Sequence, residues 1–410
     1  MPDVSVLDIL LYDEPIGTLT QIGGDRSIFA FTDDYIEEGQ RPVLGLGFKD
    51  AHGGLITGFR PVQTRLMPFF ANLLPEGHMR TYLAEQAGVN PAREFFLLWA
   101  LGTDLPGAIT VRPAGGEAWP PGAADETEAE DREERRENAL RFSLAGVQLK
   151  FSAVNEARGG LTIPARGVGG SWIVKLPSRE YDAVPENEYA MMTLARMVGI
   201  DVPPVQLVEL DAISGLPERI GSFKGPALAV ERFDRLSDGS RMHIEDFAQV
   251  FRVYPEEKYK RASYRNIASV LAAESGEGDV AEFIRRITFN ALIGNADMHL
   301  KNWSLIYPDR RTARLAPAYD FVSTVAYIPD EQAALNVSRS KRFDKFGLDE
   351  LAHLAAKAQV SEPVVLRTAR ETVARFREAW GTESGHLPIA ADVRAAIDRQ
   401  LEKVPLAAGW

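Results

Sequence analysis

An aspartate and an asparagine five positions apart, Asp297 and Asn302, lie in a polar loop between two apolar segments. Protein kinases use Asp and Asn at this spacing to orient the acceptor hydroxyl and to hold magnesium. Asp320 follows with Phe321, as in the metal-binding D-F-G element of kinases, although Val322 replaces the glycine. Asp297 and Asn302 alone could equally cap and turn a helix-to-strand connection. The three polar residues in this order favour phosphoryl transfer.

The segments around the loop have the patterns of elements that would position it. Apolar residues recur at helical spacing over residues 280–291, and the apolar run 303–307 is typical of a strand. His299 lies two positions after Asp297, where protein kinases often have a lysine that contacts the γ-phosphate. We therefore expect His299 either to donate to phosphate or to stabilise the loop.

A lysine inside a buried-looking strand is a further candidate. Lys175 lies in the apolar segment 172–177, and a lysine is rarely buried without a counter-charge. Glu188, near the start of a predicted helix over residues 186–198, would reproduce the strand-lysine to helix-glutamate pair of kinases. A surface lysine at a strand end is the alternative. The predicted strand 227–235 would lie where kinases bind adenine through the backbone.

A turn at Gly146 lies between strand-like flanks in residues 140–154 and could cover the phosphates of a nucleotide. The sequence is neither a Walker A loop nor G-x-G-x-x-G, so its signal for phosphate binding is weak. An ordinary β-hairpin would have the same pattern.

The remaining pattern predicts a small α+β domain followed by a β-rich and then a helical region. Strands are predicted over residues 4–7, 27–31, 107–111 and 205–209, and helices over 67–86, 91–101, 245–253, 264–274, 280–293, 348–358, 363–380 and 390–401. The apolar segment 69–75 is interpreted as core, with an interface role as the alternative. We expect the first domain to have no catalytic constellation of its own.

Composition limits the class of protein. The 410 residues are 45% hydrophobic and 25% charged, as in soluble globular proteins. The absence of cysteine excludes disulfides, thiolate metal sites and cysteine nucleophiles. No basic leader or membrane-length apolar run is present, so a cytoplasmic protein is expected. The net charge of -12 argues against broad nucleic-acid binding by the chain alone.

Charge also indicates a domain boundary. Residues 117–137 contain nine acidic residues against three arginines, which is typical of a solvated linker, although a specific acidic docking site is possible. The predicted division is an amino-terminal domain at 1–115, an acidic linker at 116–138, a nucleotide-binding lobe at 139–235 and a helical lobe at 236–410.

With these residues identified, nearly the whole chain resembles the HipA family, the serine/threonine kinase toxins of bacterial toxin–antitoxin modules. Residues 69–76 look like its amino-terminal signature, and residues 143–150 are similar to its S-x-A-G-x-Q-x-K loop. Residues 187–189, 229–235 and 294–302 complete the set. Position 149 departs from the family, because a leucine stands where the loop often carries an acid.

The resemblance implies a two-lobed protein-kinase-like α+β fold with an additional small amino-terminal domain. It also implies ATP and magnesium as cofactors and protein hydroxyls as acceptors, with aminoacyl-tRNA synthetases among the family's substrates. A small helix-turn-helix antitoxin is the implied partner, and through it operator DNA. The candidate residues are Asp297, His299 and Asn302 for catalysis; Ser143, Ala145, Gly146, Gln148, Lys150, Lys175, Glu188, Glu231, Phe233 and Asp320 for nucleotide binding; Asn302 and Asp320 for magnesium; and Ser143 for autophosphorylation.

Two other functions remain open at this point. A small-molecule kinase could carry a similar Asp-x-x-x-x-Asn loop, and a corepressor could retain the site with little kinase activity. Ser143, likewise, could be an autophosphorylated switch or a serine that only hydrogen-bonds its own turn.

Overall fold

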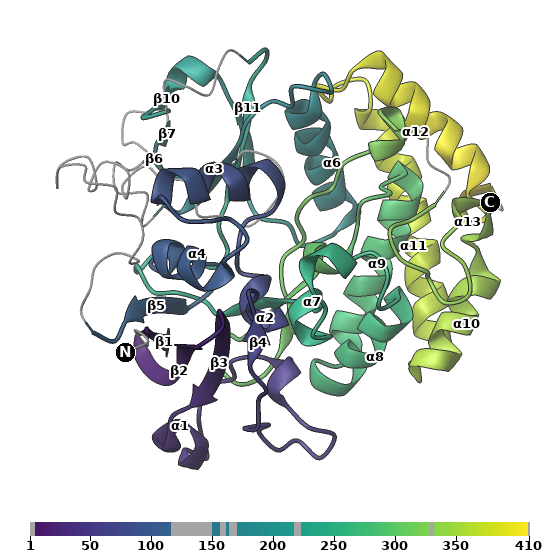
Figure 1. The fold of residues 1–410 in the computed structure, drawn as a ribbon. Coiled ribbons are helices and arrows are strands. Elements are labelled where there is room, and N and C mark those ends of the chain that lie inside the picture. Colours follow the sequence, from purple (N-terminus) through teal and green to yellow (C-terminus); the bar gives the residue numbers. More distant parts are fainter. Residues whose placement is uncertain are drawn as a thin grey trace.

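The computed structural model describes residues 5–115, 150–155, 161–163, 170–216, 223–328 and 332–408. Three sheets and a group of carboxy-terminal helices make up this part of the chain (Figure 1). The amino-terminal elements and the second sheet lie on one side of the view, and the green and yellow helices lie on the other. The predicted acidic linker falls outside the described residues, so the proposed domain boundaries stay predictions.

The amino-terminal region is built on a five-stranded sheet with the strand order β4-β3-β2-β1-β5, in which each neighbouring pair is antiparallel. Its strands are β1 (Val6–Leu11), β2 (Glu14–Ile22), β3 (Arg26–Phe31), β4 (Val62–Gln63) and β5 (Ile109–Pro113), and its helices are α1 (Asp33–Glu37), α2 (Pro68–Ala71), α3 (Gly77–Ala87) and α4 (Glu94–Leu101).

Two helix predictions in this region are wrong in extent. The single helix expected over residues 67–86 is divided into α2 and α3, because Pro75 lacks an amide hydrogen and disfavours helical backbone in the residue before it. Residues 91–93 precede α4 as a turn rather than forming its first turn. The break between α2 and α3 matters for function, because Asn72 and Glu76 lie in it and line a cavity.

The second sheet has the strand order β10-β7-β6-β8-β11-β9 and carries the predicted strand lysine. Its strands are β6 (Lys150–Asn155), β7 (Leu161–Thr162), β8 (Trp172–Lys175), β9 (Val205–Val208), β10 (Ile213–Ser214) and β11 (Ala227–Glu231). The helix α6 (Val184–Val198) begins with Pro185 in its first turn and ends at Gly199, which has φ +89°. A left-handed glycine is a common way to end a helix.

The carboxy-terminal region is mostly helical, as predicted. It contains α7 (Phe247–Val250), α8 (Tyr264–Glu274), α9 (Glu277–Ile293), α10 (Leu348–Ala358), α11 (Glu362–Glu383), α12 (Ala391–Lys403) and α13 (Pro405–Ala408), with a small sheet of β12 (Ile244–Asp246), β13 (Ser304–Ile306) and β14 (Arg314–Leu315). The helix predicted over residues 245–253 is wrong in extent: Asp246 and Gln249 form a capping box that starts α7 only at Phe247, and the helix ends at Val250.

Two large hydrophobic cores hold these elements together in the described part of the chain. One core is shared by the amino-terminal sheet and the second sheet, so that residues such as Leu7 and Phe70 belong to the same cluster as Phe151 and Val174. The other core packs α6 together with the carboxy-terminal helices. Among the described residues, no helix is long and apolar enough to cross a membrane.

Candidate active site

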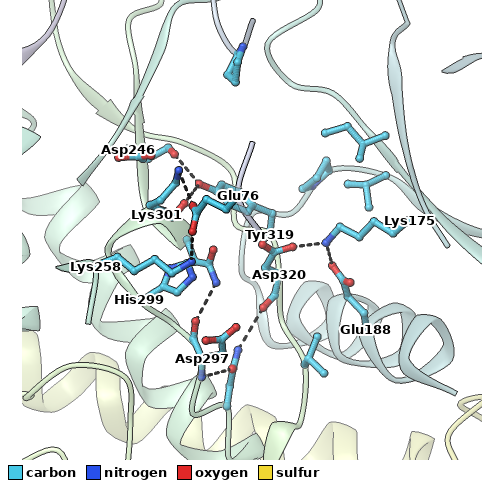
Figure 2. A pocket seen from close by; sticks show the side chains of 18 of the residues that line it. Glu76, Lys175, Glu188, Asp246, Lys258, Asp297, His299, Lys301, Tyr319 and Asp320 are labelled. Carbon is cyan, nitrogen blue, oxygen red and sulfur yellow. Dashed lines mark hydrogen bonds and ion pairs between the residues drawn. The ribbon is translucent and has the colours of Figure 1, made fainter. Parts of the chain in front are cut away.

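A cavity of about 430 Å³ lies where the amino-terminal region, the second sheet and the helical region meet. It collects the predicted residues that come from distant parts of the sequence (Figure 2). Those that line it are Lys175, Glu188, Glu231, Phe233, Asp297, His299, Asn302 and Asp320.

Lys175 is held between two carboxylates on one side of this cavity. It ends β8, where its ammonium group pairs with Glu188 of α6 and with Asp320. Lys175 and Glu188 are 5% and 2% exposed, so solvent screens neither charge. Burial alone would lower the pKa of Lys175, but Asp320 and Glu188 outweigh it and raise that pKa. The expected Lys175–Glu188 pair is therefore present, and Lys175 stays protonated.

Asp320 adopts a backbone conformation that few residue types favour. Its φ is +58°, in the left-handed region that Asp and Asn tolerate better than most residues. The next residue, Phe321, is fully buried and packs against Phe289 of α9, while Asn295 donates a 3.3 Å hydrogen bond to the Asp320 carbonyl oxygen. These contacts hold the turn that presents the Asp320 carboxylate to Lys175.

The loop from Asp297 to Asn302 is a compact turn held by its own hydrogen bonds. It follows α9, which ends at Gly294 with φ +67°. The Nδ2 group of Asn302 and the amide of His299 donate to the carbonyl oxygen of Asp297 at 3.0 and 2.8 Å. The amide of Asp297 donates to Oδ1 of Asn295 at 3.0 Å. The five-residue spacing therefore places Asn302 beside Asp297 at the cavity.

His299 is buried within this loop and is 6% exposed. Burial and the nearby Lys258 lower the pKa of His299 to about 3, so its ring is neutral near pH 7. The rings of His299 and Tyr259 pack edge to face. Within the described part of the chain, Nδ1 of His299 has no hydrogen-bond partner. A neutral imidazole can still donate one hydrogen bond, so both roles predicted for His299 remain open.

The segment after β11 connects the cavity to the amino-terminal region. Phe233 lines the cavity and stacks on Tyr319 with ring centroids 6.0 Å apart. Its neighbour Asp234 accepts hydrogen bonds from Arg232 and Arg235, and from the Gly107 amide at 2.9 Å. Burial would raise the pKa of Asp234, but the two arginines hold it well below its usual range. The predicted adenine-binding segment is thus fixed by buried ion pairs.

The predicted phosphate loop can be placed only at its end. Ser143, Ala145, Gly146 and Gln148 lie outside the described residues. Lys150 is the first residue of β6 and lies opposite Lys175 in the antiparallel pairing of β6 with β8.

Glu76, Lys258 and Lys301 line the cavity and were not predicted as site residues by the sequence analysis. Glu76, in the segment before α3, forms ion pairs with Lys258 and Lys301, both at 2.8 Å. Burial would raise the pKa of Glu76, but these two lysines lower it to about 2. The available signals were a charged residue directly after an apolar run and Lys301 lying between Asp297 and Asn302. The amino-terminal region thus supplies a carboxylate to the cavity, which the sequence analysis did not predict.

In protein-kinase-like proteins, a strand lysine pairs with a helix glutamate and faces an Asp–Asn loop across a cavity between two lobes. The residues that line the cavity of this chain have the same arrangement. Residues 7–112 match the HipA N-terminal domain, and residues 142–380 match the HipA-like C-terminal domain. The chain therefore belongs to the HipA family, as its sequence motifs suggested.

Relatives extend this result to almost the full length. "Putative kinase Y4dM" of Sinorhizobium fredii is 59% identical over 409 residues, covering 99% of this chain and 98% of that protein. "Serine/threonine-protein kinase toxin HipA" of Shewanella oneidensis is 30% identical and covers 64% of each chain.

A solved structure confirms the predicted fold class. The chain resembles one in the complex of HipA, HipB and operator DNA from the Shewanella oneidensis toxin–antitoxin system. The TM-score is 0.72 at 24% identity, with 98% of this chain and 96% of that chain covered. The α+β, two-lobed kinase-like fold with an added amino-terminal domain is therefore correct.

Proposed function

We propose that this protein is a serine/threonine protein kinase that uses ATP and magnesium. One observation carries the proposal. Lys175 forms ion pairs with Glu188 and Asp320 on one side of a cavity. Asp297 and Asn302 line the other side of the same cavity. Membership of the HipA family, with relatives named as kinases, supports the same function.

In the proposed reaction the acceptor hydroxyl oxygen attacks the γ-phosphorus of ATP. The bond from the γ-phosphorus to the β–γ bridging oxygen breaks, ADP leaves, and the hydroxyl proton passes to the carboxylate of Asp297. Lys175 binds the α- and β-phosphates, and Glu188 keeps its ammonium group in place. Glu231 and Phe233, at the end of β11, border the space for adenine. Phosphoryl transfer needs alignment and charge neutralisation more than covalent catalysis, and these residues supply both.

The oxygen atoms at the site fit a magnesium ion. Magnesium prefers oxygen ligands and is usually bound by one or two carboxylates together with substrate phosphates. Asp320 provides a carboxylate, and Asn302 uses its Nδ2 group on the Asp297 carbonyl oxygen, which leaves its amide oxygen as the acceptor. These two residues would hold the ion, which neutralises charge on the β- and γ-phosphates when it is bound.

A transfer assay tests this function directly. The full chain is incubated with ATP labelled on the γ-phosphate, magnesium and a lysate of the native host, with Asp297→Asn as the matched control. We expect labelled protein bands that contain phosphoserine or phosphothreonine and that are absent from the control. Label found only in small molecules would make the protein a small-molecule kinase, and no transfer at all would favour a binding module.

The substrate and partner are proposed from the family. An aminoacyl-tRNA synthetase is the first protein acceptor to assay. A small helix-turn-helix antitoxin that binds operator DNA is the proposed partner, supported by the likeness to HipA in the Shewanella complex with HipB and DNA and by the net charge of -12, which suits a basic protein. A pull-down from the native host at low salt should recover such a protein, and repeated failure would leave a free-standing kinase.

We also propose autophosphorylation at Ser143, which precedes β6 by seven positions. A phosphate adds roughly -1.5 to -2 charges at neutral pH and would repel those of ATP. Ser143→Asp should greatly weaken ATP binding without changing the melting temperature. Near-normal binding would instead mean that the serine only stabilises its turn, because Asp also satisfies a turn. Mass spectrometry after incubation with ATP locates the phosphate independently.

A further inference from the structure

Glu76 lies across the cavity from Lys175, and the amino-terminal region supplies it (Figure 2). Its two carboxylate oxygens take different partners: Oε2 pairs with Lys258 and Oε1 pairs with Lys301, each at 2.8 Å. The side chains of both lysines are no more than 10% exposed. The carboxylate of Glu76, which comes from the amino-terminal region, therefore neutralises part of the positive charge of Lys258 and Lys301 at the loop.

Lys301 is fixed from three directions. Besides its pair with Glu76, its ammonium group donates a 3.0 Å hydrogen bond to the carbonyl oxygen of Asn72. Asn72 is itself anchored, since its amide donates at 2.8 Å to the carbonyl oxygens of Pro68 and Val253. The carbonyl oxygen of Lys301 accepts a 3.0 Å hydrogen bond from Tyr319. Lys301 thereby holds the backbone directly before Asn302.

Lys258 connects Glu76 to the other side of the same loop. The carbonyl oxygen of Lys258 accepts a hydrogen bond from the amide of Leu300 at 3.3 Å. Its neighbour Tyr259 donates its hydroxyl group to Oδ1 of Asp297. The two lysines bound by Glu76 are thus sequence neighbours of a proposed magnesium ligand and of the residue that hydrogen-bonds the proposed base.

Removing the Glu76 charge would take away the carboxylate that Lys258 and Lys301 share in a poorly solvated site, where Asp246 compensates part of the charge of Lys301. Taking one partner from a buried ion pair is strongly destabilising. We expect the two lysine side chains to move apart in response. Because Lys258 and Lys301 are tied to the loop at Leu300 and Asn302, such movement would displace the proposed catalytic groups. A displacement of about 1 Å is enough to slow a positioned reaction about a hundredfold.

We propose that Glu76 is a positioning residue for phosphoryl transfer, through which the amino-terminal domain holds the loop from Asp297 to Asn302 in its active shape. This role rests on the proposed kinase function. It also makes the amino-terminal domain part of the active site rather than an appendage, and it assigns to its signature segment a function besides core packing.

The test compares Glu76→Gln with Glu256→Gln in the full-length chain. Glu256 also joins the two regions, through an ion pair with Arg65, but it is exposed and outside the cavity, so it controls for weakened domain contact. For Glu76→Gln we expect kcat to fall about tenfold or more, with the KM for ATP changed by less than about threefold. Glu256→Gln should match the wild type. A rate within twofold of wild type in Glu76→Gln, or equal losses in both variants, would overturn the proposal.

A thermodynamic cycle identifies the route of the effect. If Glu76 acts through Lys301, the double variant Glu76→Gln/Lys301→Met should be no slower than Lys301→Met alone. If the loss of kcat in the double variant equals the product of the losses in the two single variants, this route is contradicted. Should Glu76→Gln fail to fold, Lys301→Met carries the test, because it leaves Glu76 paired with Lys258; unchanged kcat there would overturn the proposal.

Hydrogen exchange gives a readout that does not depend on activity. The backbone amides of residues 297–302 should exchange faster in Glu76→Gln than in the wild type or in Glu256→Gln. Unchanged exchange would overturn the positioning role even if the wild type is an active kinase. If Glu76→Gln exchanges faster but the wild type has no transfer activity, Glu76 still positions the loop and the proposed kinase function is rejected.

Discussion

Tyr259 donates its phenolic hydroxyl group to Oδ1 of Asp297, so the proposed base already has a hydrogen-bond partner before an acceptor binds. Tyr259 is 41% exposed, and its ring packs edge-on against His299. Burial and the Asp297 carboxylate both raise the pKa of Tyr259, so the hydroxyl stays protonated and remains a donor. The phenol therefore limits the directions in which the carboxylate can point.

Tyr259→Phe should lower kcat while leaving the melting temperature almost unchanged. The variant keeps the ring contact with His299 and removes only a hydrogen bond to a charged group, which is worth about 1.5–3 kcal/mol. Because the tyrosine is half exposed, the smaller figure applies, and we expect about a tenfold loss. Tyr181→Phe, at a tyrosine that lines the same cavity but packs against Tyr327, is the control and should be neutral. A faster Tyr259→Phe enzyme would show that the phenol blocks the acceptor.

Asp297→Asn and Asp320→Asn should both abolish transfer for different reasons. Loss of a general base typically costs about 10²- to 10⁴-fold, and Asp297→Asn should still bind ATP with magnesium. Asp320→Asn should lose the magnesium-dependent part of nucleotide affinity. Calorimetric titration with and without magnesium separates the two variants. Full activity in both would contradict the kinase function.

Backbone conformation makes the choice of substitution important at Asp320. Its φ of +58° costs a residue without a short polar side chain roughly 1–2 kcal/mol. Asp320→Ala should therefore melt below Asp320→Asn, although neither binds magnesium. Equal melting temperatures would mean that the turn relaxes when the side chain is removed.

Lys175→Met should destabilise the fold as well as abolish activity. It removes the buried ammonium group that pairs with Glu188, and breaking a buried pair by removing one partner costs about 3–5 kcal/mol. Lys175→Met/Glu188→Gln should recover most of that stability but none of the activity, because the phosphate-binding charge is still missing. Denaturant unfolding measures the first effect and the transfer assay the second. A double variant no more stable than Lys175→Met would show that the carboxylate is not the source of the loss.

Glu245 should make stability depend on pH. It is a fully buried residue of β12, where it accepts hydrogen bonds from Tyr307 and from the Leu46 amide of the amino-terminal region. Burial raises the pKa of Glu245 from 4.5 to about 8. The folded state thus binds this proton more tightly than the unfolded state, and its contribution to stability is lost as the pH rises from about 4.5 to 8.

Glu245→Gln removes this titration, so its melting temperature should decline less than that of the wild type between pH 5 and pH 9. Glu85→Gln, at an exposed position on α3, is the control and should follow the wild-type curve. Parallel curves for Glu245→Gln and wild type would mean that Glu245 is charged throughout this range.

The sequence was most informative where a functional requirement is local or where a residue type demands a partner. The spacing of Asp297 and Asn302 is local, because hydrogen bonds within one short loop bring the two residues together. The pairing of Lys175 with Glu188 could be predicted because a buried lysine needs a carboxylate and a helix follows the strand. The helical spacing of apolar residues predicted α8, α9 and α10 within a few residues of their observed bounds.

Contacts between distant segments could not be predicted in this way. Nothing in the pattern around Glu76 indicates that its partners would be Lys258 and Lys301, because hydrophobic periodicity describes which face is buried and not what covers it. The break between α2 and α3 was missed because the apolar spacing continues past Pro75. Strand β12 was missed because it has three residues and is set by its pairing with β13.

The hydrogen bond from Lys301 to Asn72 spans 229 positions of the sequence. The ribosome adds Asn72 to the chain long before it adds Lys301, and domains tend to fold from the amino terminus onward. The segment that carries Asn72 and Glu76 is therefore synthesised long before the loop that it supports. A nascent chain stalled before position 301 has this segment but not the whole loop, so an interrupted round of translation releases no working catalytic centre into the cell.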